Sequence, residues 1–290
     1  MAEPGSIVAG YDGSAEAAAA VQWAAQQALL RGCPLRVVHV SIWPLLTKNL
    51  GPVPGVADSG LERAAQAILE DGVSRARGAA PGLDVEGTLL QGLPASYLAE
   101  ISAGEEMLVV GSRGLGGFLG LLVGSVSLEL AATATCPVAV IRPDLQPGGP
   151  VVVAVDGSGS PAALADACAL AAVWQAALTI VHVRHTPPGY GLRGQPDAEE
   201  PAGDILGSAL GRARTLAPSV QAEGRILTDT SVPHAIIKAS EGARMLVVGT
   251  KGHGFLRETI GSTAHAVLHH ARGPVLISRR GTAARSVEVQ

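Results

Sequence analysis

A glycine- and serine-rich segment, residues 111–127, combines residue types that could bind a phosphate group. Gly111 and Gly114 are followed, after nine further residues, by Gly124 and Ser125. Glycine lets backbone N–H groups approach an anion without interference from a Cβ atom. Ser125 falls where a helix is expected to begin, and the free N–H groups of a helix N-terminus favour an anion. The spacing therefore predicts a phosphate-binding loop, to which Arg113 would add positive charge.

Two other phosphate-binding signatures do not fit this segment. A P-loop needs a lysine before its final Ser or Thr, but Gly124 stands directly before Ser125. The dinucleotide pattern Gly-x-Gly-x-x-Gly, started at Gly114, ends in Leu119 instead of glycine. The remaining alternative is a flexible loop that ends in an ordinary serine N-cap.

The chain contains an internal repeat, which sets the position of this loop within the fold. Four segments recur in the same order: Val8–Ser14 as Val152–Ser158, Val37–Val40 as Ile180–Val183, Met107–Ser112 as Met245–Thr250, and Cys136–Ile141 as Gly273–Ser278. The separation falls from 144 residues for Asp12 and Asp156 to 137 for Pro137 and Pro274. We interpret this decrease as small deletions in the second copy, and we predict domains at 1–143 and 150–280 joined by a Pro- and Gly-rich linker.

Each copy alternates short β-branched runs with Ala-rich segments of helical length. Strands are predicted near 6–11, 35–41, 83–90, 106–111 and 137–142, with helices near 15–31, 59–78, 94–103 and 125–134, and the second copy repeats the strands near 150–155, 177–183, 220–227, 244–249 and 274–279. Nearly continuous apolar strands indicate sheets buried on both faces. The predicted fold class is α/β, with two tandem doubly wound five-stranded parallel-sheet domains.

In such sheets ligands bind beyond the carboxyl ends of the strands, where the winding direction changes. We therefore expect Asp12–Ser14, after the first strand, to lie beside Gly111–Gly114, after the fourth. Asp12 has an alternative role as a turn residue or as the N-cap of the first helix. The last strands, Pro137–Ile141 and Pro274–Ser278, lack an inward charge or a central proline, so we expect these two edges to cover each other.

Composition limits the class of partner. The 290 residues carry 21 basic and 25 acidic side chains, a net charge of −4, without a basic block, which argues against nucleic acid and anionic membranes. We expect neither a signal peptide nor a membrane span. Three cysteines without a C-x-x-C pair favour reduced thiols in the cytoplasm, with Cys33 in a turn where it could be exposed.

These motifs together resemble the tandem, ATP-binding type of universal stress protein over nearly the whole chain. The resemblance rests on V-x-G-x-D-G-S at Val8–Ser14, G-2x-G-9x-G-S at Gly111–Ser125 and C-P-V-x-V-I at Cys136–Ile141. It implies a flavodoxin-like sandwich similar to the adenine-nucleotide alpha-hydrolases and antiparallel pairing of the last strands. Our further hypothesis is a homodimer of whole chains, built on this intrachain pseudo-dimer. The implied ligand is ATP together with Mg2+.

The same resemblance implies which residues of the first copy contact ATP. Gly10 and Asp12 would face the adenosine, and the backbone at Val40 would contact the adenine edge. The ribose and phosphates would be held by Gly111, Ser112, Arg113, Gly114, Leu115, Gly116, Gly117, Gly124, Ser125, Val126 and Ser127.

The second copy departs from the pattern. Eight residues, not nine, separate Gly252 from Gly261, Glu258 enters the loop, and Ala154 replaces Gly10. The corresponding candidates are Ala154, Asp156, Val183, Gly249, Thr250, Lys251, Gly252, His253, Gly254, Gly261, Ser262 and Thr263. We expect this second site to be weaker than the first, or vacant.

The predicted function is an ATP-binding stress-response regulator and not a fast enzyme. Hydrolysis of a triphosphate needs a placed base, a metal carboxylate and charge stabilisers, whereas the first loop offers only Arg113 and Asp12. A slow ATPase and a nucleotide-free interaction module are the alternatives. His265 and His269 are four residues apart, but without a third ligand we interpret them as a helix face and predict no metal site.

Overall fold

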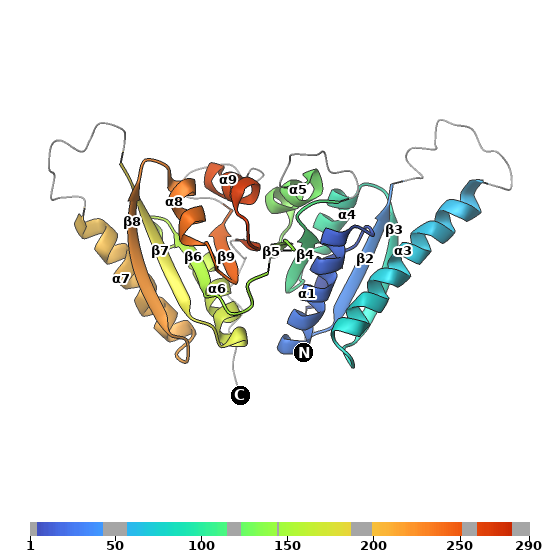
Figure 1. Ribbon diagram of the computed structural model, residues 1–290, viewed down its shortest axis with the longest axis horizontal. Coiled ribbons are helices and arrows are strands. Elements are labelled where there is room, and N and C mark those ends of the chain that lie inside the picture. Colours follow the sequence, from blue (N-terminus) through green and yellow to red (C-terminus); the bar gives the residue numbers. More distant parts are fainter. Residues whose placement is uncertain are drawn as a thin grey trace.

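The computed structural model describes residues 5–42, 57–114, 123–143, 145–186, 199–250 and 260–279. In this part of the chain the strands form one ten-stranded sheet in the order β3-β2-β1-β4-β5-β10-β9-β6-β7-β8 (Figure 1). Candidate residues Leu115, Gly116 and Gly117 lie outside the described residues. So do the second-copy candidates at positions 251–254.

Each half contributes five parallel strands. The first half holds β1 (Ile7–Gly10), β2 (Leu35–Ser41), β3 (Val85–Gln91), β4 (Met107–Gly111) and β5 (Val138–Ile141). The second half holds β6 (Val151–Val155), β7 (Leu178–His185), β8 (Ala222–Asp229), β9 (Met245–Gly249) and β10 (Val275–Ser278). β1 lies between β2 and β4, and β6 lies between β7 and β9, all in parallel. The predicted fold class of two doubly wound five-stranded parallel sheets is confirmed.

Helices cover both faces of the sheet. They are α1 (Ala15–Arg31), α3 (Ala57–Ala79), α4 (Pro94–Ile101), α5 (Ser125–Thr133), α6 (Pro161–Trp174), α7 (Glu199–Leu216), α8 (Val232–Ala239) and α9 (Ser262–His270). One apolar core joins α1, α3, α6 and α7 to the sheet, and a second joins α4, α5, α8 and α9 to its other face. Because each core draws residues from both halves, the two domains pack as one body.

The sheet continues from one half to the other through β5 and β10. These strands pair antiparallel, with Ala139 opposite Leu276, and every residue of both is buried. The expectation that the two edges cover each other is therefore confirmed. On the face of the sheet covered by α1 and α6, the rings of Trp23 and Trp174 meet edge to face at 6.1 Å. The indole N–H of Trp174 donates to Gln27 Oε1 at 3.0 Å, so the two helices are joined across the halves.

The loop between β6 and α6 corrects one inference from the sequence. Ser14 is the N-cap of α1, two residues after Asp12, whereas Ser160 is the N-cap of α6, four residues after Asp156. The separation between the copies thus rises from 144 to 146 residues here before it falls, so the second copy carries an insertion as well as deletions. Ser160, at the end of this longer loop, adopts a left-handed conformation with φ of 41°.

The cysteine environment also differs from expectation in one place. Cys33 lies in the turn before β2, yet only 6% of it is exposed, because that turn packs under α1. Burial raises the pKa of Cys33, and it raises the pKa of Cys136 to about 12 and of Cys168 to about 11. All three thiols are therefore protonated, unreactive groups at neutral pH.

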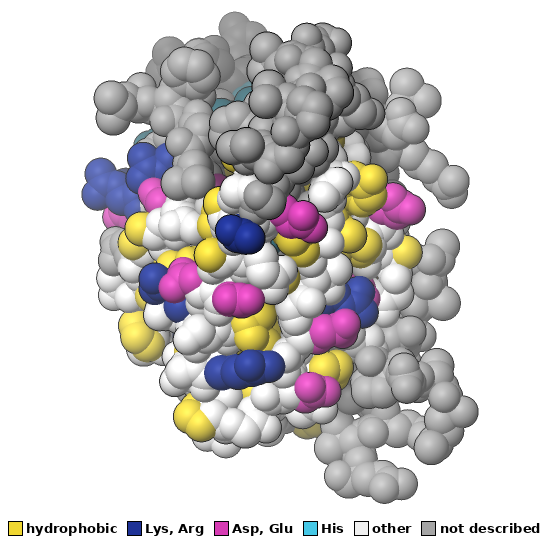
Figure 2. All heavy atoms as spheres, turned by 90° about the vertical axis from the view of Figure 1, so that its right-hand side faces the viewer, with side chains coloured by type: hydrophobic (Ala, Val, Ile, Leu, Met, Phe, Trp, Pro, Cys, Tyr) yellow, Lys and Arg dark blue, Asp and Glu magenta, His cyan; other side chains and the backbone are white. Residues whose placement is uncertain are grey.

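The surface is mixed in charge on the face that Figure 2 presents, which is the α3 side of the first half. Basic and acidic side chains alternate there without a patch of one sign (Figure 2). Among the described helices, none combines the length and apolar character that a membrane crossing would need.

Candidate functional site

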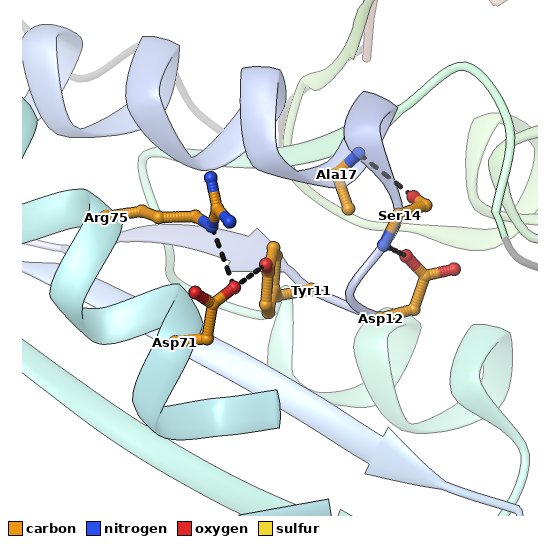
Figure 3. A network of polar contacts seen from close by, with 6 residues as sticks. All are labelled: Tyr11, Asp12, Ser14, Ala17, Asp71 and Arg75. Carbon is orange, nitrogen blue, oxygen red and sulfur yellow. Dashed lines mark hydrogen bonds and ion pairs between the residues drawn. The ribbon is translucent and has the colours of Figure 1, made fainter. Parts of the chain in front are cut away.

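The turn after β1 positions the first candidate carboxylate. Asp12 Oδ1 accepts a hydrogen bond from the backbone N–H of Ser14 at 3.0 Å, and the Ser14 hydroxyl in turn accepts from Ala17 N at 3.1 Å (Figure 3). Asp12 is therefore the turn residue, and Ser14, not Asp12, caps α1. This arrangement holds the carboxylate at the carboxyl end of β1, where the sheet changes its winding direction.

The loop after β4 is closed at its base by two backbone hydrogen bonds. Ser112 N donates to Ile141 O at 2.9 Å and so extends the ladder between β4 and β5, and Gly124 N donates to Ser112 O at 2.7 Å. The second half repeats both contacts. Thr250 N donates to Ser278 O at 3.1 Å, and Gly261 N donates to Thr250 O at 2.8 Å.

Each closed loop leads into a helix whose N-terminus has no side-chain cap. Gly124 is the N-cap of α5 and Gly261 that of α9, and neither helix receives a side-chain cap hydrogen bond, in contrast to α1. The first N–H groups of a helix have no intrahelical acceptor. Those of α5 belong to Ser125, which is exposed, and to the half-buried Val126. This N-terminus therefore offers donors and a favourable dipole to an anion.

The turn after β1 and the loop after β4 lie side by side, as the sequence predicted. A Cβ atom built on Gly114 would collide with Oδ2 of Asp12, so the backbone of Gly114 lies directly against that carboxylate. On the other side, a Cβ on Gly124 would lie 3.9 Å from Gly114 N. Asp12, Gly114 and Gly124 thus form a continuous row from the end of β1 to the start of α5.

Two of the candidate glycines serve packing. A Cβ on Gly111 would lie 2.7 Å from the carbonyl carbon of Glu16 and 2.9 Å from Ala17 N, because the first turn of α1 crosses this strand end. A Cβ on Gly10 would lie 3.2 Å from Leu98 Cδ1, on the α4 side of the sheet. The sequence interpretation assigned Gly111 to phosphate approach, but its lack of a side chain is already required by α1.

Several candidate side chains contact other residues of the protein or are buried. The Ser127 hydroxyl is buried and donates to Gly111 O at 2.8 Å, which fixes the start of α5 to the end of β4. Arg113 Nη2 lies 2.7 Å from Glu16 Oε1, so its charge is partly offset by a neighbouring carboxylate. Val40 is 8% exposed near the end of β2, where its backbone pairs with Leu90.

Sequence reasoning missed a polar network behind the Asp12 turn. The Tyr11 hydroxyl donates to Asp71 Oδ2, and Arg75 Nε donates to the same oxygen at 2.7 Å (Figure 3). Gly72 makes room for the ring, since a Cβ there would lie 2.6 Å from Tyr11 Cδ1. The bonds from Arg75 and Tyr11 lower the pKa of Asp71. The spacing of Asp71 and Arg75 is visible as an i, i+4 pair, but nothing in the sequence connects them to Tyr11.

A histidine supports the same turn in each half. His39 Nδ1 lies 2.8 Å from Tyr11 O, and His182 Nδ1 lies 3.0 Å from Val155 O. Because a carbonyl oxygen only accepts hydrogen bonds, Nδ1 carries the proton in both rings. Both histidines therefore brace the backbone at the end of the first strand of their half.

The second half holds its acidic residue differently. Asp156 Oδ1 accepts from Ser158 N at 2.9 Å, from the Ser158 hydroxyl, and from the Ser160 hydroxyl at 3.1 Å. The bond from Ser158 N corresponds to that from Ser14 N to Asp12 Oδ1, and the two hydroxyl bonds add to it. Ala154 packs its methyl group into the core on the α8 and α9 side, and Val155 replaces Tyr11, so the network to α3 has no counterpart.

The remaining second-half candidates are placed as follows. The base of the second loop is formed by Gly249, Thr250, Gly261, Ser262 and Thr263, and Val183 lies on β7, next to β6.

On α9, the rings of His265 and His269 are 4.5 Å apart. Burial, the other two histidines of this helix and Arg142 lower the pKa of His269. Within the described ranges, no three His, Cys, Asp or Glu side chains gather in a way that could hold a metal ion.

The fold and these loops define a class of protein: a fused pair of doubly wound α/β domains, each with a closed glycine loop and an uncapped helix at its topological switch point. The universal stress protein family model matches residues 5–142 and again residues 149–279, and the chain belongs to this family as a tandem member. A universal stress protein of Mycobacterium tuberculosis is 34% identical over 287 residues, covering 94% of this chain and 97% of its own.

A solved structure shares the fold of the whole chain. The crystal structure of a universal stress protein from Archaeoglobus fulgidus has a TM-score of 0.70 at 22% sequence identity and covers 97% of this chain and 98% of its own. A universal stress protein in complex with cAMP matches 48% of this chain and 97% of its own, at 26% identity and a TM-score of 0.38.

Proposed function

We propose that the first half binds ATP and that the protein is a regulator that holds this nucleotide without efficient hydrolysis. The observation that carries the proposal is the row formed by Asp12, Gly114 and Gly124 in front of the uncapped N-terminus of α5. A carboxylate suits ribose hydroxyls, and free helix N–H groups suit phosphates. The spacing therefore matches a nucleotide that lies across the switch point, with its phosphates at Gly124, Ser125 and Val126 and its base near Val40.

Mg2+ would accompany the ATP mainly through phosphate oxygens and water, as this ion usually does. The charge of ATP bound at α5 would be offset by the helix dipole and in part by Arg113, whose partner Glu16 competes for the same guanidinium.

The proposal of slow or absent hydrolysis rests on the carboxylates around the loop. In the described part of this region they are Asp12 and Glu16, of which one holds the Ser14 backbone and the other pairs with Arg113. A general base must reach the attacking water with a free acceptor. Occupancy by ATP would then act by favouring the conformation that binds it better.

The second half is proposed to bind ATP more weakly or not at all. Its loop is one residue shorter, and the hydroxyl groups of Ser158 and Ser160 both donate to Oδ1 of Asp156. We further propose that the protein works in the cytoplasm and that whole chains associate as dimers, which light scattering over a range of concentrations would test.

Isothermal titration of the purified protein with ATP and MgCl2 tests the binding proposal, after mass spectrometry of any small molecules that co-purify. We expect one tight site per chain. Parallel titrations with ADP, AMP and cAMP rank the dependence on the phosphate chain, and phosphate release after stringent purification measures hydrolysis. Two equal sites would overturn the asymmetry, absence of binding would overturn the function, and rapid phosphate release would favour an ATPase.

A further inference from the structure

Arg142 and Arg279 occupy equivalent places in the two halves and cross the junction in opposite directions. Each directly follows a junction strand, since β5 ends at Ile141 and β10 ends at Ser278. Arg142 donates to Leu268 O at 2.6 Å and to Gly273 O at 3.0 Å, both in the second half. Arg279 donates to Leu130 O, in the first half, at 3.1 Å.

The carbonyl groups that these arginines contact belong to the two helices that follow the glycine loops. Leu130 lies in the last turn of α5, and Leu268 lies in the last turn of α9. A positive charge at a helix C-terminus stabilises the helix through its dipole. Both helices have nine residues, a length that is marginal without tertiary contacts. The order of each helix therefore depends on what holds its ends.

The strand behind each arginine is tied to the loop of its own half. Ile141 O, next to Arg142, accepts from Ser112 N at the base of the first loop, and Ser278 O, next to Arg279, accepts from Thr250 N at the base of the second. Arg142 is 5% exposed, so its bonds are shielded from competing water. A contiguous path thus runs from the loop of one half to the helix of the other.

We propose that Arg142 and Arg279 are crossed positioning residues, each of which orders the anion-binding helix of the opposite half. The first site then depends on Arg279 from the second half, and the second loop depends on Arg142 from the first. The proposal rests on the proposed function only for its nucleotide readout, because the effect on helix order exists without a ligand.

Hydrogen exchange of the full chain tests the crossed arrangement directly. In Arg279→Met, amides of α5 should exchange faster while those of α9 keep their wild-type rates, and Arg142→Met should show the reverse. Each variant is the matched control of the other, since both remove one arginine from equivalent places at the same junction. If either variant loosens both helices alike, or neither helix, a general role in the interface replaces the crossed one.

ATP titration adds a functional readout, in which a merely structural role at the junction would affect both variants alike. Arg279→Met should weaken the tight site by roughly fivefold, and Arg142→Met should change it by less than about twofold. Arg279→Lys keeps a charged donor and should recover part of the affinity, and it replaces the methionine variant if that one loses its secondary structure. Wild-type affinity in Arg279→Met overturns the inference. If the wild type binds no ATP, the proposed function fails, and the exchange rates still decide the inference.

Discussion

The carboxylate of Asp12 and the backbone of Gly114 lie against each other, although they follow different strands of the sheet. This contact joins the turn after β1 to the loop after β4 and leaves no space for a side chain at position 114. The geometry of the proposed ribose and phosphate contacts therefore depends on one missing Cβ atom.

Gly114→Ala should weaken ATP binding without unfolding the protein. The new methyl group would push Asp12 Oδ2 aside, and a loss of about tenfold, or about 1.4 kcal/mol, is expected in titration calorimetry. Gly78→Ala is the control, because a Cβ at that position on α3 meets no atom within 4 Å. Unchanged affinity in Gly114→Ala would show that Asp12 does not touch the nucleotide.

Gly111→Ala should instead destabilise the fold. Its methyl group would meet the backbone of α1 at 2.7 Å, and overpacking against the backbone costs about 1–3 kcal/mol. Urea denaturation measures this free energy of unfolding. Gly148→Ala, in the linker with open space around it, should stay within about 0.5 kcal/mol of the wild type. Equal stability of the two variants would mean that α1 can shift away from β4.

Asp166 makes the stability of the junction depend on pH. Burial raises the pKa of this α6 carboxyl to about 6, although the Ser278 hydroxyl donates to it and Arg31 offsets part of the effect. Between the unfolded value of 3.8 and about 6, the folded state binds a proton that the unfolded state has lost. The contribution of Asp166 therefore falls as the pH rises through this window.

Asp166→Asn should remove that dependence. Relative to the wild type, its free energy of unfolding should gain about 2 kcal/mol between pH 4 and pH 7. Chemical denaturation of both proteins across this range measures the difference. A difference that is constant with pH would indicate that Asp166 titrates normally in the folded protein.

Tyr11→Phe separates the hydroxyl from the ring in the network behind the Asp12 turn. The ring keeps its place over Gly72, but the bond to Asp71 is lost, and about 1 kcal/mol of stability should go with it. The lowered pKa of Asp71 stabilises the folded state above the unfolded pKa of this carboxyl, and this stabilisation is lost as the pH falls. Because the variant lacks the Tyr11 bond that contributes to the shift, its free energy of unfolding should fall less than that of the wild type when the pH is lowered. Tyr97→Phe, at a partly exposed position on α4, is the control for both measurements.

Much of the fold could be predicted from the sequence because its signals are local. Apolar runs predicted the strands, and the internal repeat predicted two equivalent halves. The lack of protecting charges in Pro137–Ile141 and Pro274–Ser278 predicted that these two strands pair. The meeting of Asp12 and Gly114 also followed, since the end of a first and of a fourth strand adjoin in every sheet of this topology.

The contacts that escaped prediction join residues that are far apart in the chain or depend on one loop. Arg279 and Leu130 are 149 positions apart, and neither has a spacing that indicates a partner. The need for glycine at position 111 comes from the path of α1, which spacing does not define. The insertion before Ser160 is hidden because a deletion follows it within the same repeat.

The fusion of the two halves through β5 and β10 has a consequence for how substitutions act. In a homodimer every substitution occurs twice, so a change that impairs one site impairs both. In this chain it occurs once. Tyr11 can therefore differ from Val155, and Gly10 from Ala154, so that one half can specialise in a ligand while the other half only completes the sheet.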